Sequence, residues 1–129
     1  MKFQPEKTAQ QSINAYGPGW VSVDGEKIQG SVVIGSRGQR FNWDCARFED
    51  LDAGHFDRLA EQQPELVIFG SGQRILFPKG EWLKNLYAAR IGIETMDTPA
   101  ACRTYNILAG EGRDVLLALL IEPQTPGVP

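Results

Sequence analysis

The sequence predicts a mixed-sheet domain of the α/β or α+β class, and three observations lead to this class. Up to residue 43 the apolar residues alternate with the two-residue period of strands, and afterwards strand-like runs alternate with segments of helical period. Residues 66–69 and 115–121 are apolar throughout, as strands covered on both faces require. The chain has 129 residues, 42% hydrophobic and 22% charged, which suits one globular domain, with a core over about 13–121.

The N-terminal part is predicted to be all β. Gly17-Pro18-Gly19 and Asp24-Gly25 are turn sequences, and the first of them joins the two strands of a β-hairpin. A break follows at 35–38, where glycine and polar residues interrupt the alternation. We therefore expect four strands, at residues 13–16, 20–23, 28–34 and 40–43.

Helices and strands then alternate to the end of the domain. Helices are expected at residues 53–62, 81–90 and 98–109, and strands at 66–69, 91–95 and 115–121. The near-continuous apolar character of these three strands predicts that they lie inside one sheet, with helices packed on it and no solvent face. In the second helix Trp82 or Leu83, Leu86 and Tyr87 are expected to face inward. In the third helix Thr98 suits the N-cap, Pro99 the first helical position and Gly110 the C′ position.

Charge and composition exclude several classes of protein. Thirteen Lys and Arg against 16 Asp and Glu leave a net charge of −3, which disfavours nucleic acid or an anionic membrane as the main partner. Residues 1–7 lack the apolar stretch of a signal peptide, and the longest apolar run, 115–121, is too short to insert into a membrane. Cys45 and Cys102 are too few and too far apart for a disulfide framework or a zinc site. We expect a cytoplasmic protein with no metal and no cofactor, and with flexible ends at 1–10 and 122–129.

The first candidate binding loop is Gly70-Ser71-Gly72, directly after the apolar strand at 66–69. Two glycines allow backbone N–H groups to turn toward an anion, and Arg74 follows closely. The alternative is a tight turn in which a glycine adopts positive φ. Ser71 is a possible nucleophile, although it does not stand in a Gly-x-Ser-x-Gly motif, and nothing in the spacing places it in a triad with His55 and Asp97.

The second candidate loop, Met96-Asp97-Thr98, lies at the start of the last helix, where Asp97 and Thr98 suit capping of the helix N-terminus. Cys102 lies about one turn further on, beside Arg103, whose charge lowers a thiol pKa. The alternative is a buried structural cysteine, since no histidine or second cysteine is close in the sequence.

The third loop, at 110–113, ends in Arg113 and is either a turn with a solvated ion pair or a clamp for a ligand.

Several motifs taken together resemble one small domain family. They are Leu66-Val67-Ile68-Phe69-Gly70-Ser71-Gly72, Gly92-Ile93-Glu94-Thr95-Met96-Asp97-Thr98, Ala101-Cys102-Arg103-Thr104-Tyr105-Asn106-Ile107-Leu108 and Glu111-Gly112-Arg113. The family contains the mitochondrial complex I assembly factor three, an adipogenesis-associated protein and many uncharacterised bacterial proteins. The resemblance covers about 13–121 and implies a single three-layer α/β domain: a mixed central β-sheet with an N-terminal β-hairpin and helices packed on the sheet. It implies no catalytic mechanism.

These observations favour a non-enzymatic binding or assembly-factor-like module, whose partner is another protein or a small anionic ligand. In open α/β sheets ligands bind beyond the carboxyl ends of strands, so the cleft is expected between the loops at 70–72 and 96–98. The alternative is a small enzyme that uses Ser71 or Cys102 in the same cleft. The oligomeric state stays open, and Asp97 could instead make this cleft a purely structural junction. The candidate ligand-binding residues are Gly70, Ser71, Gly72, Arg74, Asp97, Thr98, Arg103 and Arg113.

Overall fold

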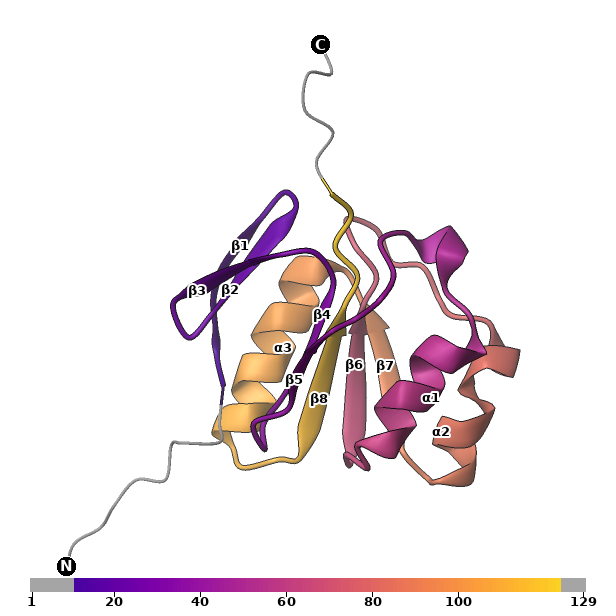
Figure 1. Ribbon diagram of the computed structural model, residues 1–129. Helices are drawn as coiled ribbons and strands as arrows, with labels where there is room; N and C mark the ends of the chain where they lie inside the picture. The colour runs from indigo at the N-terminus through magenta and orange to yellow at the C-terminus, as the bar shows by residue number, and fades with distance from the viewer. Residues whose placement is uncertain (1–10, 124–129) are drawn as a thin grey trace, which may run out of the picture.

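Residues 11–123, which the computed structural model describes, form two β-sheets with helices packed against the larger one (Figure 1). The expectation of flexible ends concerns residues 1–10 and 122–129, nearly all of which lie outside the described residues. The elements are β1 (Ile13–Gly17), β2 (Trp20–Val23), β3 (Glu26–Gln29), β4 (Val32–Gly35), β5 (Arg40–Asn42), a 3-10 turn η1 (Phe48–Asp50), α1 (Ala53–Glu61), β6 (Leu66–Gly70), a 3-10 turn η2 (Gly80–Leu83), α2 (Lys84–Ala88), β7 (Gly92–Met96), α3 (Thr98–Gly110) and β8 (Val115–Leu119).

The larger sheet is mixed, and it is the middle of three layers. Its strand order is β5-β4-β8-β6-β7, with β4 antiparallel to both β5 and β8 and with β6 parallel to both β8 and β7. The smaller sheet is antiparallel, in the order β1-β2-β3. Figure 1 shows α3 and the smaller sheet on one side of the larger sheet, and α1 and α2 on the other. The predicted α/β class, the mixed central sheet and the N-terminal hairpin are confirmed.

The single strand expected at 28–34 is wrong, because the chain changes sheets within it. β3 ends at Gln29 in the smaller sheet, and β4 begins at Val32 in the larger one. Gly30, between them, adopts a φ of +113°, in a region that side chains disfavour, and so redirects the chain. The apolar residues on both sides of this glycine made two short strands look like one long one.

The helix expected at 81–90 is also shorter and less regular than predicted. It consists of the 3-10 turn η2 followed by the five-residue α2. Trp82, Leu83 and Leu86 are buried as expected, but Tyr87 is 58% exposed and not inward-facing. A 3-10 turn has three residues per turn, so the residues after it face a different direction from those in an uninterrupted α-helix.

The start and end of α3 each differ by a residue or two from the prediction. Asp97, not Thr98, is the N-cap, since its carboxylate accepts from the Ala100 N–H at 2.9 Å. Pro99 is consequently the second helical residue, not the first. Gly110 is the last residue of the helix, and Gly112, at φ +85°, is the glycine that leaves it. Asp and Thr are both good caps, so the sequence alone did not separate them.

Two apolar clusters cover the faces of the larger sheet. One packs β1 and β2 and α3 against Ile68 and Leu117, and the other packs α1, η2 and α2 against Phe69 and Leu116. Every residue of β8 is buried, as predicted for a strand covered on both faces. Although β7 shares this sheet as expected, it lies at the edge and exposes Gly92 and Glu94, so the prediction that its strand has no solvent face is wrong. Within residues 11–123, the structure contains no helix of the length and apolar character needed to cross a membrane.

Candidate functional site

The glycine loop at 70–72 and the helix-capping loop at 96–98 meet at the carboxyl ends of β6 and β7. Because β6 and β7 are parallel neighbours, Gly70 pairs with Met96 and both strands end at the same edge. The Ser71 N–H donates to the Met96 carbonyl at 2.9 Å, and the Thr98 N–H donates to the Gly72 carbonyl at 2.8 Å. The N–H groups of Ser71 and Thr98 are therefore already hydrogen-bonded to the neighbouring loop and do not face a ligand.

The two glycines of the first loop have structural roles. A Cβ atom at Gly70 would lie 2.6 Å from a Leu119 methyl group and 3.1 Å from the Ala101 Cβ, so β6 packs too closely there for a side chain. Gly72 has a φ of +112°, in the region that glycine adopts readily. These positions agree with the alternative of a tight turn.

Ser71 is a clamp for the loop that follows it. Its side chain is almost fully buried, and its hydroxyl donates to the Arg74 carbonyl at 2.6 Å and accepts from the Leu76 N–H at 2.9 Å. The hydroxyl therefore both donates and accepts a hydrogen bond within the loop. His55 does not approach it, since its ring nitrogens lie 3.0 Å from the Asp52 carboxylate and 2.8 Å from the Asp44 carbonyl. Among the described residues, the hydrogen-bond partners of the Ser71 hydroxyl are all backbone groups, so none of them is a general base.

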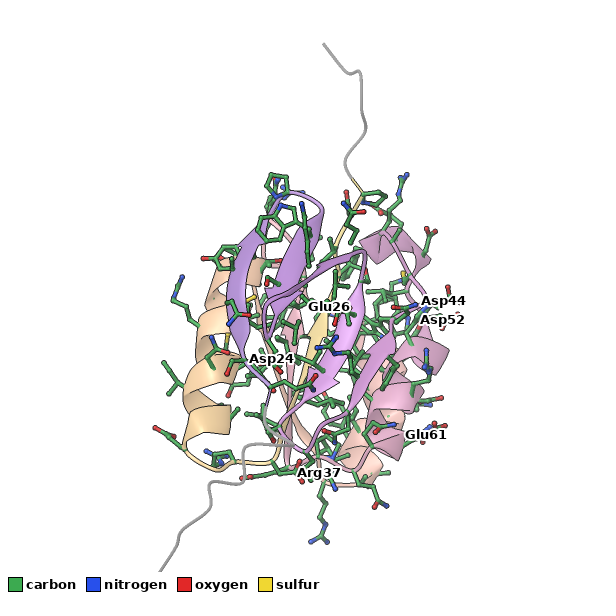
Figure 2. The ribbon with its side chains drawn as sticks, turned by 60° about the vertical axis from the view of Figure 1, so that its left-hand side comes forward. Asp24, Glu26, Arg37, Asp44, Asp52 and Glu61 are labelled. Atoms are coloured by element: carbon green, nitrogen blue, oxygen red, sulfur yellow. The ribbon has the colours of Figure 1, made fainter. Side chains whose placement is uncertain are left out.

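The arginines do not converge on this edge. Arg113 forms an ion pair with Glu65, at 2.7 Å, beside the amino ends of β8 and β6. Gly70 is five residues beyond Glu65 along β6, a distance of about 16 Å at about 3.3 Å per residue. This opposite end is where Figure 2 shows Arg37, whose guanidinium pairs with Asp114 at 3.1 Å.

The other two candidate arginines lie in different surroundings. Arg103, with Cys102 and Asn106, lines a small cavity of about 200 Å³ between α3 and β1. Arg74 is exposed in the loop that Ser71 clamps. The structure therefore brings together Gly70, Ser71, Gly72, Arg74, Asp97 and Thr98, and it leaves Arg103 and Arg113 apart from them.

Cys102 is buried in the apolar cluster beneath α3. It is 1% exposed, and burial raises the pKa of its thiol to about 12, although the Arg103 charge lowers it by a smaller amount. The thiolate is the nucleophilic form, so this environment suppresses nucleophilic chemistry. Cys45 is partly exposed, and burial likewise raises the pKa of its thiol. Both cysteines are free.

These pKa directions predict the reactivity of the thiols. At pH 8, a pKa of about 12 leaves roughly one in ten thousand Cys102 thiols ionised, so the folded protein should react with Ellman's reagent slowly and only at Cys45. In a Cys45→Ser variant, colour should develop only after denaturant is added. Rapid release of one equivalent from the folded Cys45→Ser variant would contradict this assignment.

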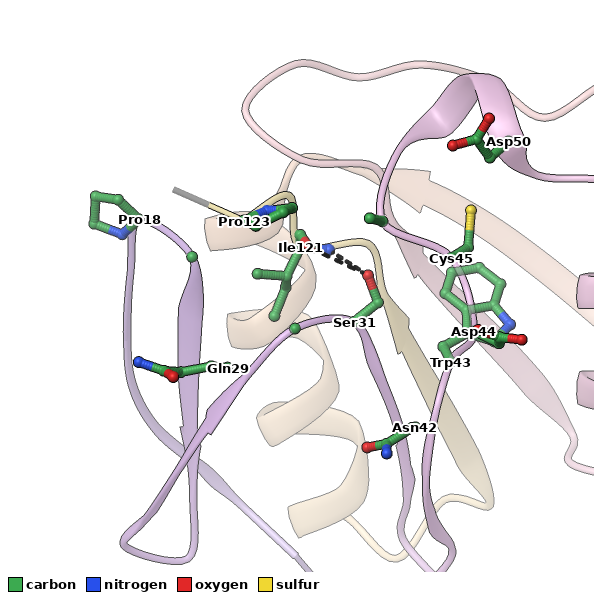
Figure 3. Close-up of a pocket in the computed structure, with 13 residues that line it drawn as sticks. Pro18, Gln29, Ser31, Asn42, Trp43, Asp44, Cys45, Asp50, Ile121 and Pro123 are labelled. Atoms are coloured by element: carbon green, nitrogen blue, oxygen red, sulfur yellow. Dashed lines mark hydrogen bonds between the residues drawn. The ribbon is translucent and has the colours of Figure 1, made fainter. Parts of the chain in front are cut away.

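A cavity of about 980 Å³ lies elsewhere and was not predicted (Figure 3). It is an open groove lined by the β1–β2 turn, the connection between β3 and β4 at residues 29–31, the segment at 42–50, and residues 121 and 123. In its wall the Ser31 hydroxyl accepts from the Ile121 N–H at 2.8 Å, and Asp44, Cys45 and Asp50 contribute polar side chains. The lining comes from separate segments that share no motif, so no sequence signal could have identified it. Among residues 11–123, no three His, Cys, Asp or Glu side chains gather closely enough to hold a metal ion.

Comparisons with known proteins agree with the resemblance noted in the sequence. The chain is 29% identical to the Danio rerio protein named NADH dehydrogenase [ubiquinone] 1 alpha subcomplex assembly factor 3, over 94% of this chain and 70% of that protein. It is 36% identical to an uncharacterised protein of Rhodobacter capsulatus, over 86% of this chain and 85% of that one. A crystal structure of a Bordetella parapertussis protein matches with a TM-score of 0.84 and 35% identity, covering 92% of this chain and all of that chain.

A family model matches residues 13–120, which span both sheets and every helix described above. The three-layer fold and the relatives named as assembly factors were both expected from the resemblance, and both are confirmed. The chain belongs to the family described as "Protein of unknown function (DUF498/DUF598)".

Proposed function

We propose that this protein is a non-enzymatic module that binds another protein, as an assembly factor does. The observation that carries the proposal is the loop after β6, in which Ile75 is 50% exposed and Phe77 is 73% exposed. The family supports the same class of function, because the Danio rerio relative is named an assembly factor.

The exposed loop has an ordered backbone rather than an unconstrained one. The buried Ser71 hydroxyl bonds both the Arg74 carbonyl and the Leu76 N–H, so the backbone on either side of Ile75 is fixed. Large apolar side chains held in water expose surface that a partner protein would bury, and aromatic residues are frequent anchors of such interfaces. A fixed loop also loses little conformational entropy on binding.

The cleft between the loops at 70–72 and 96–98 offers few free groups for binding an anion. The N–H groups of Ser71, Thr98 and Ala100 already donate to acceptors within the protein, and the Asp97 carboxylate occupies the N-terminus of α3. We therefore assign any anion binding to the exposed Arg74 guanidinium, which would pair with a carboxylate on the partner at the margin of the apolar loop. The buried thiol of Cys102 and the engaged hydroxyl of Ser71 give no support to the enzyme alternative.

A capture experiment tests the proposed function. The full chain, with a photo-crosslinker attached at an introduced surface cysteine in a Cys45→Ser background, is incubated with an extract of the source organism. We expect the amount of crosslinked partner protein to fall at least tenfold in the double variant Ile75→Ser with Phe77→Ser, because this variant lacks the apolar anchors. The control is Tyr87→Ser with Ile107→Ser, two exposed apolar residues on α2 and α3. Equal capture by the loop variant and the control would contradict the proposal.

A further inference from the structure

Three of the four sheet edges in the described part of the chain are protected against pairing with another strand. At β1, the Asn106 side chain bonds both the N–H and the carbonyl of Ile13, at 2.8 and 2.9 Å. At β3 and β5, the Glu26 carboxylate pairs with the Arg40 guanidinium at 2.7 Å, and β5 is only three residues long. Short edge strands and charged side chains are the usual means by which proteins prevent edge pairing.

The fourth edge, the outer side of β7, presents unpaired backbone groups. The Gly92 N–H donates to the Glu65 carbonyl at 3.3 Å, and the Met96 carbonyl accepts from the residue after β6, so the backbone groups of Gly92 and Met96 face β6. Successive residues of a strand direct their N–H and C=O groups to alternate sides. The N–H and C=O groups of Ile93 and Thr95 therefore point away from the sheet, and within residues 11–123 they have no backbone hydrogen-bond partner.

β7 carries only one of the usual protective features, a single charged side chain. β7 has five residues, pairs with β6 without a register shift and contains no proline or lysine. Glu94 is its one charged side chain, and it is exposed. By the criteria that natural sheet edges meet, β7 is open to strand addition.

The exposed apolar loop begins beside the carboxyl end of β7. The Ser71 hydroxyl lies 3.3 Å from the Met96 carbonyl, at the end of β7, while it bonds the Arg74 carbonyl and the Leu76 N–H. The backbone next to Ile75 is thus within a few ångströms of the carboxyl end of β7. A segment laid along β7 would reach the apolar loop as it leaves the strand.

We propose that β7 receives an extended segment of a partner protein as a sixth strand, an inference that rests on the proposed function and names the kind of partner. The segment would pair with the N–H and C=O groups of Ile93 and Thr95, and its apolar side chains would contact Ile75 and Phe77. Strand addition of this kind obtains affinity from main-chain hydrogen bonds and specificity from the side chains next to the edge.

The charge of Glu94 argues for a different protein over a second copy of this chain. In antiparallel self-pairing, the register that uses all four outward groups places Ile93 opposite Thr95 of the second copy. That register sets the two Glu94 side chains directly opposite each other, in the pair where side chains approach most closely. Like charges in such a pair are destabilising, whereas a lysine or arginine there is attracted. The fitting occupant is a segment with alternating apolar residues and a basic residue opposite Glu94.

Selection from a displayed library of random twelve-residue peptides, with the full chain as bait, tests the occupant. We expect the enriched peptides to alternate apolar residues and to carry Lys or Arg in one phase of the alternation. With Glu94→Lys as bait, these peptides should bind roughly fivefold to tenfold more weakly and acidic peptides should be enriched. Glu61→Lys, an exposed site on α1, is the matched control and should leave the selection unchanged. Enrichment of no peptide, or of the same peptides by both variants, overturns the proposal.

Amide hydrogen exchange with one enriched peptide tests the edge itself in the unmodified chain. The Ile93 and Thr95 amides should exchange rapidly in the free protein and at least tenfold more slowly in the complex, whereas Gly92 is already bonded to Glu65. Protection confined to residues 73–77 would overturn strand addition and leave the proposed function standing. Protection of Ile93 and Thr95 that rises with protein concentration, without peptide, would identify a second copy as the occupant and also overturn the proposal.

Discussion

Leu117→Asp is expected to abolish the cooperative unfolding transition, leaving an unfolded chain at 25 °C and pH 7. Leu117 has no exposed surface and lies at the centre of the larger sheet, where it pairs with Ile34 on β4 and Ile68 on β6. Loss of a buried leucine costs about 2–5 kcal/mol, and a buried carboxylate without a partner costs several more. Single domains have a free energy of unfolding of about 5–15 kcal/mol, so this change removes most or all of it.

Far-ultraviolet circular dichroism and a urea titration measure this outcome. The matched control is Ile107→Asp, the same kind of substitution at a residue of α3 that is 60% exposed. That control should change the free energy of unfolding by less than about 1 kcal/mol. A Leu117→Asp protein with the spectrum and urea midpoint of the control would mean that β8 is not the buried centre of the sheet.

The elements that the sequence predicted best are those whose burial determines their composition. Leu66–Gly70 and Val115–Leu119 are covered on both faces, and this requires the uninterrupted apolar runs from which they were recognised. β7 shows the limit of that reasoning. Its residues at 91–95 are mixed, and whether such a strand is central or at an edge depends on sheet order, which the pattern of one strand does not contain.

The candidate site was predicted only in part, because the sequence indicates which loops follow strands but not which side chains gather beside them. The loops at 70–72 and 96–98 meet because they follow parallel neighbouring strands, and the strand–helix pattern was sufficient to predict that. The exposed Ile75 and Phe77 were missed, although apolar residues just after a glycine turn, outside any helix or strand, were a visible signal. Arg113 was grouped with the site from residue type alone, and spacing in the sequence does not tell the two ends of a sheet apart.

Asn106 illustrates how a residue within a recognised motif can support the fold rather than a ligand. It lies on α3, where it is half-buried, and its amide bonds both backbone groups of Ile13 in the way a neighbouring strand would. Together with the Tyr105 hydroxyl, which donates to the Gln11 carbonyl at 2.9 Å, it attaches the start of β1 to α3. The smaller sheet contributes Val21 and Val23 to the apolar cluster that also contains buried residues of α3, so this attachment also holds the smaller sheet against that cluster.

Asn106→Leu is therefore expected to lower the free energy of unfolding by about 2–4 kcal/mol, because leucine has a similar size but leaves the N–H and the carbonyl of Ile13 without partners. Urea titration followed by tryptophan fluorescence gives the free energy, and amide exchange in residues 13–23 should accelerate more than exchange in β6. Asn85→Ala is the matched control, since the Asn85 side chain also makes a hydrogen bond, to Asp57 at 2.8 Å, but on the exposed surface. That control should cost less than about 0.5 kcal/mol. Equal losses in the two variants would show that the Asn106 amide does not hold β1 in place.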